Sequence, residues 1–266
     1  RSGSASGTCR PRSPTAAAEA RGIRLGIDTG GSSLKAAAVD LGTGALLSGP
    51  RSFPTPAPST PAAVARVVRE IVTVFPEVSG PVGFAFPAVV TAGIARTAAN
   101  VDRGWIGVDG AALVREATSR PAVFLNDADA AGLAEMRFGA GRGEGGTVLL
   151  LTLGTGIGSA LFRDGLLLPN TELGHMEIRG REAEHRASAR VRTAESLGWE
   201  EWAQRLNEVL ARFHALLWPD LFILGGGVSE NWPRFGHLLE SPARILPARL
   251  GNDAGIIGAA LATCER

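Results

Sequence analysis

The chain contains the same arrangement of strand, glycine turn and strand twice. At 23–40 the apolar run IRLGID is followed by TGGSS and then LKAAAVD, and at 147–165 TVLLLTL is followed by GTGIG and SALFRDG. Short apolar runs bounded by glycine-rich turns are typical of buried strands. Two such units far apart in one chain form an internal repeat and not a tandem array. We therefore predict two α/β lobes that meet at a cleft, with helices packed on mixed sheets.

The remaining pattern completes these two lobes. Amphipathic or capped segments predict helices at 60–75, 111–117, 127–138, 200–217 and 253–262. Apolar runs predict further strands at 45–53, 81–90, 122–126 and 220–229. We expect a disordered tail at 1–21, an N-terminal lobe at 22–125 and a C-terminal lobe at 126–266, with the closing helix 253–264 packing back on the first lobe.

Composition excludes several classes of function. The 266 residues include 27 basic and 26 acidic side chains, so no global charge indicates a nucleic-acid or membrane partner. Cys9 and Cys264 lie at opposite ends of the chain, which provides neither a disulfide framework nor metal-ligand spacing. With no apolar run of a signal peptide or a membrane span, we expect a soluble cytoplasmic protein.

Both glycine turns are candidate anion sites. Gly30 and Gly31 allow several backbone N–H groups to face one anion, and Asp28 before them could hold Mg²⁺, directly or through water. An ordinary hairpin turn explains the first motif equally well. The second turn adds the hydroxyl of Thr155. Each turn leads into a strand, and no GxxxxGK[ST] segment exists, so Rossmann and P-loop sites are excluded.

A strand runs directly into Asn126 and Asp127, where a carboxylate could act as a base at the edge of the sheet. Asn and Asp are also favoured helix N-caps, and spacing alone favours that structural role. Further along, Glu172, His175 and Glu177 could form a metal site, a catalytic pair or a pocket for polar ligands, or they could belong to a solvated polar loop.

The densest basic stretch lies shortly after this group, at 179–192. Arginines bind phosphate oxygens in pairs of hydrogen bonds, although a solvated, salt-bridged face is slightly favoured. The five arginines are Arg179, Arg181, Arg186, Arg190 and Arg192.

Together these motifs resemble the ROK group of sugar kinases within the actin-like ATPase superfamily, from about Arg24 to the C-terminus. The resemblance implies two ribonuclease-H-like lobes around a central cleft. It identifies DTGGSSLKAAAVD as the first phosphate motif, LTLGTGIG as the second and ILGGGVS as the turn beside adenosine. The implied ligands of the donor are Asp28, Gly30, Gly31, Ser32 and Lys35 in the first motif, Thr155 and Gly156 in the second, and Gly225, Gly226 and Gly227 in the third.

The segments FAFPAVV, RTAANVDRGWIG, FLNDADAAG and NTELGHMEIRG are most similar to the polyphosphate-using glucokinases of that group. The resemblance implies transfer of a phosphoryl group from polyphosphate or ATP, with Mg²⁺, to the 6-hydroxyl of glucose and of mannose. It makes Asp127 the general base. The implied sugar ligands are Asn100, Asn126, Glu172, His175 and Glu184.

The chain departs from most of the group in two places. The cysteine-rich zinc motif that normally follows the sugar-binding histidine is replaced by GREAEHRASARVR, so we expect no zinc site, and this segment brings the arginines near the donor. Ser33 stands where related kinases often carry glycine, which puts the shape of the first turn in doubt.

Three rival functions are a sugar-responsive ROK regulator without kinase activity, a kinase for fructose or N-acetylmannosamine, and a filament-forming actin-like protein. About twenty residues precede the first strand, too few for a DNA-binding helix pair. A filament protein would leave the Glu172 and His175 pocket without a purpose. The sequence does not decide between a monomer and a homodimer.

Overall fold

The structure is a computed structural model that describes residues 22–99 and 101–264. The predicted tail at 1–21 and the candidate sugar ligand Asn100 lie outside the described residues. Within the described chain, no helix combines the length and apolar character needed to cross a bilayer.

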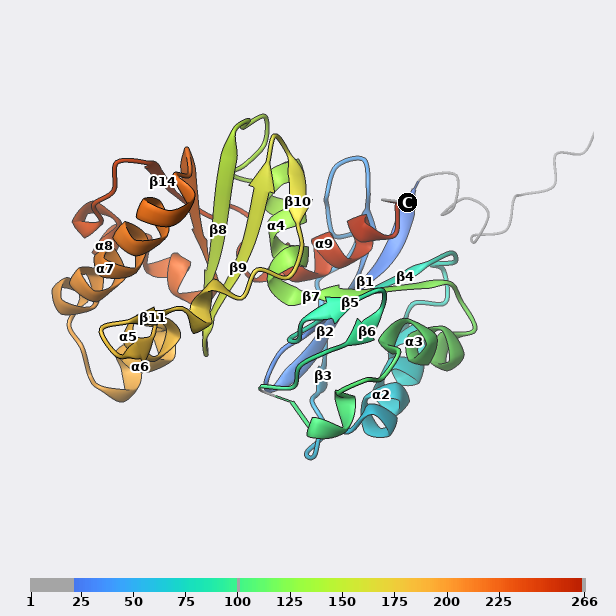
Figure 1. Ribbon diagram of the computed structural model, residues 1–266. Coiled ribbons are helices and arrows are strands. Elements are labelled where there is room, and N and C mark those ends of the chain that lie inside the picture. The colour runs from blue at the N-terminus through green and yellow to red at the C-terminus, as the bar shows by residue number, and fades with distance from the viewer. Residues whose placement is uncertain (1–21, 100, 265–266) are drawn as a thin grey trace, which may run out of the picture.

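The first sheet has five strands in the order β3-β2-β1-β4-β7. The three strands β1, β2 and β3 are antiparallel, whereas β4 and β7 run parallel to β1. The strands are β1 (Ile23–Thr29), β2 (Ser33–Asp40), β3 (Arg51–Pro54), β4 (Val82–Phe86) and β7 (Ala122–Asn126). Helices α2 (Pro61–Val74) and α3 (Gly110–Thr118) share an apolar core with this sheet, and a small hairpin, β5 (Val90–Thr91) and β6 (Ile94–Ala95), follows β4 (Figure 1).

The second sheet repeats this design, in the order β10-β9-β8-β13-β14. Its first three strands are antiparallel, and β13 and β14 run parallel to β8. The strands are β8 (Thr147–Leu153), β9 (Ile157–Arg163), β10 (Leu166–Leu168), β13 (Leu221–Gly225) and β14 (Arg244–Pro247). Around the core on its outer side lie α7 (Trp199–Leu217), α8 (Trp232–Phe235), α5 (Glu184–Ala187), α6 (Ala189–Ala194) and the hairpin of β11 (Glu177–Ile178) and β12 (Arg181–Glu182).

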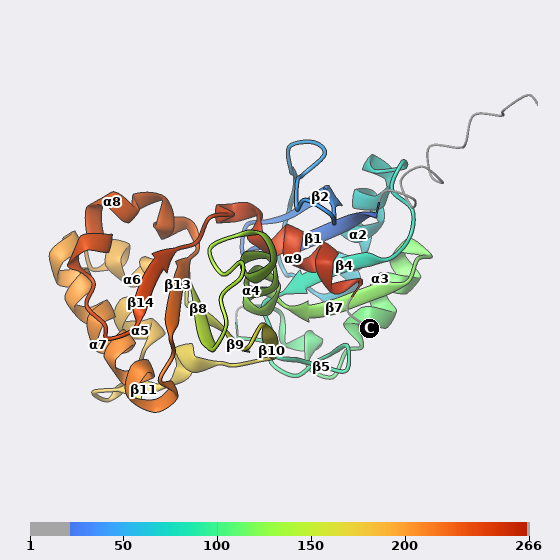
Figure 2. The same cartoon turned by 90° about the horizontal axis from the view of Figure 1, so that it is seen from above.

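Two helices, α4 (Asp127–Phe138) and α9 (Ala254–Ala262), lie between the sheets (Figures 1 and 2). Each follows the last strand of one sheet and packs on the other sheet, α4 against β9 and α9 against β1 and β4. The packing is close enough to require glycine: a Cβ added at Gly83 would lie 1.7 Å from the carbonyl oxygen of Ala259. The same addition at Gly258 would lie 1.6 Å from the carbonyl oxygen of Ala130. The crossed helices therefore hold the two sheets face to face.

The predicted pair of α/β lobes with mixed sheets is confirmed. The strand predicted at 45–53 begins only at Arg51, because Gly49 and Pro50 interrupt it and proline has no N–H for a ladder. Strand β14 and the short elements of 177–194 were not predicted. We propose that the lobe boundary lies at 125/126, one residue before the point where β7 ends and α4 begins.

Candidate active site

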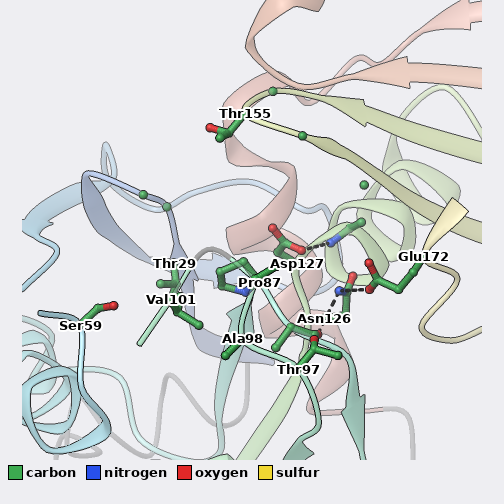
Figure 3. Close-up of a pocket in the computed structure, with 18 of the residues that line it drawn as sticks. Thr29, Ser59, Pro87, Thr97, Ala98, Val101, Asn126, Asp127, Thr155 and Glu172 are labelled. Atoms are coloured by element: carbon green, nitrogen blue, oxygen red, sulfur yellow. Dashed lines mark hydrogen bonds between the residues drawn. The ribbon is translucent and has the colours of Figure 1, made fainter. Parts of the chain in front are cut away.

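A cavity of about 1060 Å³ lies between the lobes. The first glycine turn, the segment 55–59 and the segment after β6 line it from the first lobe. The start of α4, the second glycine turn and the loop after β10 line it from the other side (Figure 3). Among the candidate site residues, those that line it are Gly30, Gly31, Asn126, Asp127, Thr155, Gly156, Glu172, His175 and Glu184.

The junction of β7 and α4 shows how one dipeptide has two roles. Asn126 is the N-cap of α4, and its Oδ1 accepts a hydrogen bond from the Asp129 N–H at 3.0 Å. Its Nδ2 donates to the Ala88 carbonyl at 3.1 Å and lies 3.5 Å from Oε1 of Glu172. Asp127 is the first helical residue, and its side chain faces the cavity (Figure 3). The capping function therefore belongs to Asn126, which leaves the Asp127 carboxylate available for chemistry.

Asp127 at this junction and Asp28 on β1 both have raised pKa values. Burial raises the pKa of Asp127 to about 6, and the charge of Glu172 contributes, although the Ala128 N–H donates to its Oδ1 at 2.9 Å and opposes the shift. Burial raises the pKa of Asp28 to about 7, the nearby charge of Asp127 adds to this, and Lys35 opposes it. A carboxyl group with a pKa near neutrality is suited to accept a proton during a reaction at pH 7.

The first turn is closed by hydrogen bonds of its own and is open at Gly31, which lines the cavity. The Gly30 N–H donates to the Ser33 carbonyl at 2.9 Å, and Thr55 braces the turn by donating its hydroxyl to the Gly30 carbonyl at 2.8 Å. At Gly31 an added Cβ would meet nothing within 4 Å, so the backbone there is open to a ligand. Ser33 begins β2 without disrupting this turn.

Three candidates of the first motif do not line the cavity as the described residues define it: Asp28, Ser32 and Lys35. Lys35 lies opposite Asp28 in the register of β1 and β2. The carboxylate of Asp28 points toward α9, because a Cβ added at Gly255 would lie 2.6 Å from its Cγ. Asp28 and Lys35 therefore place charge behind the first glycine turn and do not line the cavity themselves.

The second and third turns lie together at the ends of two parallel strands. The Gly154 N–H donates to the Gly156 carbonyl at 3.0 Å, and Glu184 packs so closely that a Cβ on Gly156 would lie 2.2 Å from its Oε2. Gly226 has φ of +83°, and a Cβ there would lie 2.5 Å from the carbonyl oxygen of Leu153. Of the described residues, Gly225, Gly226 and Gly227 lie outside the cavity lining, next to the second turn.

The polar group after β10 forms a network. His175 Nε2 lies 3.7 Å from Glu172 Oε2, and its Nδ1 lies 3.2 Å from Glu182 Oε2. The hydrogen bond to Glu182 raises the pKa of His175, and partial burial raises that of Glu172. Ligand atoms of His175, Glu182 and Glu184 lie within 4.8 Å of one another, so these three could share a cation. Glu177 of the sequence group is exposed on β11 and is absent from the cavity lining within the described chain.

The arginine stretch is mostly engaged with α7. Arg179 Nη2 lies 3.1 Å from Glu208 Oε1, and Arg186 also pairs with Glu208. The guanidinium of Arg192 stacks 3.6 Å from the centre of the Trp199 ring. Arg190 lies at the second turn, where its backbone N–H donates to the Gly154 carbonyl at 3.1 Å.

Sequence reasoning missed much of the first lobe's contribution. Segment 55–59 and the side chains Arg96, Arg103 and Ile106 line the cavity. The proline-rich run TPAPST signals a turn, but no short-range pattern shows that this turn faces a site in the other lobe.

Comparison with known proteins gives four consistent similarities. A model of the ROK family matches residues 24–189. The chain is 48% identical over 240 residues to a polyphosphate glucokinase of Mycobacterium tuberculosis, covering 90% of both chains. The inorganic polyphosphate/ATP-glucomannokinase of an Arthrobacter species superposes with a TM-score of 0.88 at 45% identity, covering 91% of this chain and 98% of that one. A ROK family glucokinase from Streptomyces griseus, solved with glucose and AMPPNP, gives a TM-score of 0.77 at 26% identity, with 92% and 100% covered.

Proposed function

The chain belongs to the ROK family, and from that premise we propose that it is a kinase that transfers a phosphoryl group from polyphosphate or ATP to the 6-hydroxyl of glucose. The two similar enzymes named for polyphosphate cover nine-tenths of the chain. The observation that carries the proposal is the position of Asp127, which faces a cavity lined by both glycine turns and by Glu172. Mannose is a second acceptor in the proposal, because the Arthrobacter enzyme is named a glucomannokinase.

Asp127 is the proposed general base. Its burial disfavours the charged form, and proton transfer from a sugar hydroxyl relieves that cost as the phosphoryl group is transferred. The Ala128 N–H donates to Oδ1, so Oδ2 is the oxygen that we propose receives the proton. The side chain starts a helix whose cap is supplied by Asn126, so the carboxylate is held rigidly.

Glu172, His175 and Asn126 are the proposed ligands of the sugar hydroxyls. They combine carboxylate, imidazole and amide groups on one side of Asp127, which suits a neutral ligand with many hydroxyls. Glu184 supports the second turn and reaches the same cavity, so we keep it as a ligand near the anomeric end.

The two exposed glycine turns are the proposed donor site, with the third turn beside the second for the adenosine of ATP. Backbone N–H groups there would stabilise charge on the transferring and leaving phosphoryl groups. Asp28 is the proposed carboxylate for Mg²⁺ and would reach the ion through water, because its side chain lies behind the first turn, toward α9, and does not line the cavity. When bound, the ion would neutralise charge on the phosphate oxygens. Arg190, next to Gly154, is the arginine best placed to meet a longer phosphate chain.

One assay matrix tests the proposal. Glucose, mannose, fructose and N-acetylmannosamine are each incubated with ATP or polyphosphate, with Mg²⁺ or with a chelator, and sugar phosphate is measured. We expect product with glucose from either donor, lost with the chelator, and little with fructose. Absence of product with glucose from both donors would contradict the proposal. A sedimentation assay with nucleotide is the control for the actin-like alternative. Nucleotide-dependent pelleting of the protein, without formation of sugar phosphate, would favour a filament-forming protein. We also propose that the reaction takes place in the cytoplasm.

A further inference from the structure

Asn170 joins the two walls of the cavity. Its side-chain Oδ1 accepts a hydrogen bond from the Val90 N–H at 2.7 Å, and its Nδ2 donates to the Val90 carbonyl at 2.8 Å. The amide therefore pairs with β5 of the first lobe as a neighbouring strand would. Its own backbone N–H donates to Oδ2 of Asp129 at 2.8 Å. We call Asp129, Asn170 and Val90 the Asn170 link.

The link has features that a surface contact would lack. Asp129 is 2% exposed, and its Oδ1 is buried without a hydrogen-bond partner among the described residues. Asn170 has φ of +62°, a left-handed conformation that Asn adopts more readily than most residues. The Asp129 carboxyl is buried although it accepts one hydrogen bond, and the Asn170 backbone is held in an unusual conformation. Both features indicate that the position of residue 170 is strongly constrained.

Each end of the link leads to one wall of the sugar pocket. Asn170 precedes Glu172 by two residues. On the other side, Val89 next to Val90 donates its N–H to Oγ1 of Thr97 at 2.9 Å, and its carbonyl accepts from the Arg96 N–H at 2.8 Å. Thr97 and Arg96 both line the cavity. Among the described residues, no hydrogen bond joins the glycine turns of the donor site to the link.

We propose that Asp129 and Asn170 are positioning residues that fix the distance between the Glu172 wall and the 96–99 wall, and thereby set the affinity for the acceptor sugar and not for the donor. This inference rests on the proposed function. Asp129 acts through the backbone of Asn170, and Asn170 acts through Val90, so neither needs to touch the substrate.

The test uses the Asn170→Gly variant, because glycine keeps the left-handed backbone and removes both hydrogen bonds to Val90. We expect the KM for glucose to rise about tenfold, as two hydrogen bonds are lost. The KM values for ATP and polyphosphate should stay within about twofold of those of the wild type. Asn252→Gly, an exposed asparagine in the second lobe, is the matched control and should change neither KM.

A second pair of variants keeps the test valid if Asn170→Gly folds poorly. Asp129→Asn retains an oxygen that can accept from the residue 170 N–H, and Asp129→Ala removes it. We expect the glucose dissociation constant, measured by calorimetry without donor, to rise at least five times more in Asp129→Ala than in Asp129→Asn. An unchanged glucose KM in folded Asn170→Gly, or equal rises for sugar and donor, would overturn the inference. Failure of the proposed function is distinguishable, since the wild-type protein itself would then form no glucose phosphate.

Discussion

The two helices between the sheets begin with the same local sequence but do different things. Asn126-Asp127-Ala128 opens α4, Asn252-Asp253-Ala254 opens α9, and each Asn is followed six residues later by a glycine. At α4 the Asn side chain caps the helix and the Asp faces the large cavity. At α9 a 3-10 turn leads into the helix, no side chain caps it, and Asn252 instead donates to Glu230 at 2.8 Å.

The surroundings of the two aspartates, Asp127 and Asp253, explain the difference between the two helix starts. Asp253 lies at a separate, open hollow beside Arg249. Asp127 is buried instead, with the charge of Glu172 adding to its raised pKa, and its own charge raises the pKa of Asp28. The shared motif thus specifies where a helix starts. Reactivity comes from the groups that the opposite elements bring to that start.

The largest difference between the two helix starts is expected in the turnover number of variants at their aspartates. Asp127→Asn preserves the shape of the side chain and removes the proton acceptor, so kcat for glucose phosphorylation should fall at least about 100-fold. Asp253→Asn should leave kcat within about twofold. Both variants should keep the wild-type circular dichroism spectrum. Near-normal turnover in a folded Asp127→Asn protein would show that the base lies elsewhere.

The next contrast concerns the glycines of the crossed helices. In Gly258→Ala the new methyl would meet the Ala130 carbonyl of α4, and backbone cannot rotate away as a side chain can. We expect the free energy of unfolding to fall by about 3 kcal/mol, despite a helix-propensity gain of about 1 kcal/mol.

The counterpart in α4 is Gly132, where a methyl would meet the Ala160 Cβ at 2.7 Å and the Phe162 ring at 2.8 Å. The overlap is smaller than the 1.6 Å approach at Gly258, and the ring can shift although the Ala160 Cβ cannot, so Gly132→Ala should cost less, about 2 kcal/mol. Urea unfolding of both variants measures the difference. Equal losses would show that the α4–α9 contact is no tighter than the contact of α4 with the sheet.

A smaller difference between Asp127 and Asp253 is expected in the pH dependence of kcat/KM. Because the pKa of Asp127 is raised to about 6, the protonated and inactive form accumulates below pH 6, and kcat/KM at pH 5 should be about one tenth of its plateau. Asp28 titrates nearby, so the apparent value belongs to the pair. Asp253→Asn should keep this profile. A flat profile from pH 5 to 7 in the wild type would argue against Asp127 as the base.

The same raised pKa has a defined sign for stability. The folded-state value of about 6 exceeds the ordinary 3.8, so the fold binds the proton more tightly than the unfolded chain does. The contribution of Asp127 to stability is therefore present below about pH 4 and is lost as the pH rises toward 6. Asp127→Asn should remove this part of the pH dependence in urea unfolding, and Asp253→Asn should not.

Sequence alone predicted the lobes and the glycine turns because those features are local. The start of α4 at Asp127 was predicted to the residue, since an apolar strand met a capping residue there. Strand β14 was missed because RILP is short and ends in proline. The sharing of roles between Asn126 and Asp127 was not predictable, because it depends on Ala88 and Glu172, which are distant in the chain. Asn170 was missed for the same reason: its partner Val90 is eighty residues away.

The smallest contrast is between the two asparagines. Asn126→Ala removes the cap of α4 and should lower the free energy of unfolding by about 1 kcal/mol, whereas Asn252→Ala loses one exposed hydrogen bond and should cost less than about 0.5 kcal/mol. Asn126→Ser separates the two functions of this residue, because serine can cap a helix but cannot reach the Ala88 carbonyl as the amide does.

We expect Asn126→Ser to recover most of the stability lost in Asn126→Ala while its glucose KM stays raised. Urea unfolding and steady-state kinetics of the three variants measure both quantities. If the serine variant recovered stability and glucose affinity together, Asn126 would act on the sugar only by holding the helix, and the two asparagines would differ in degree and not in kind.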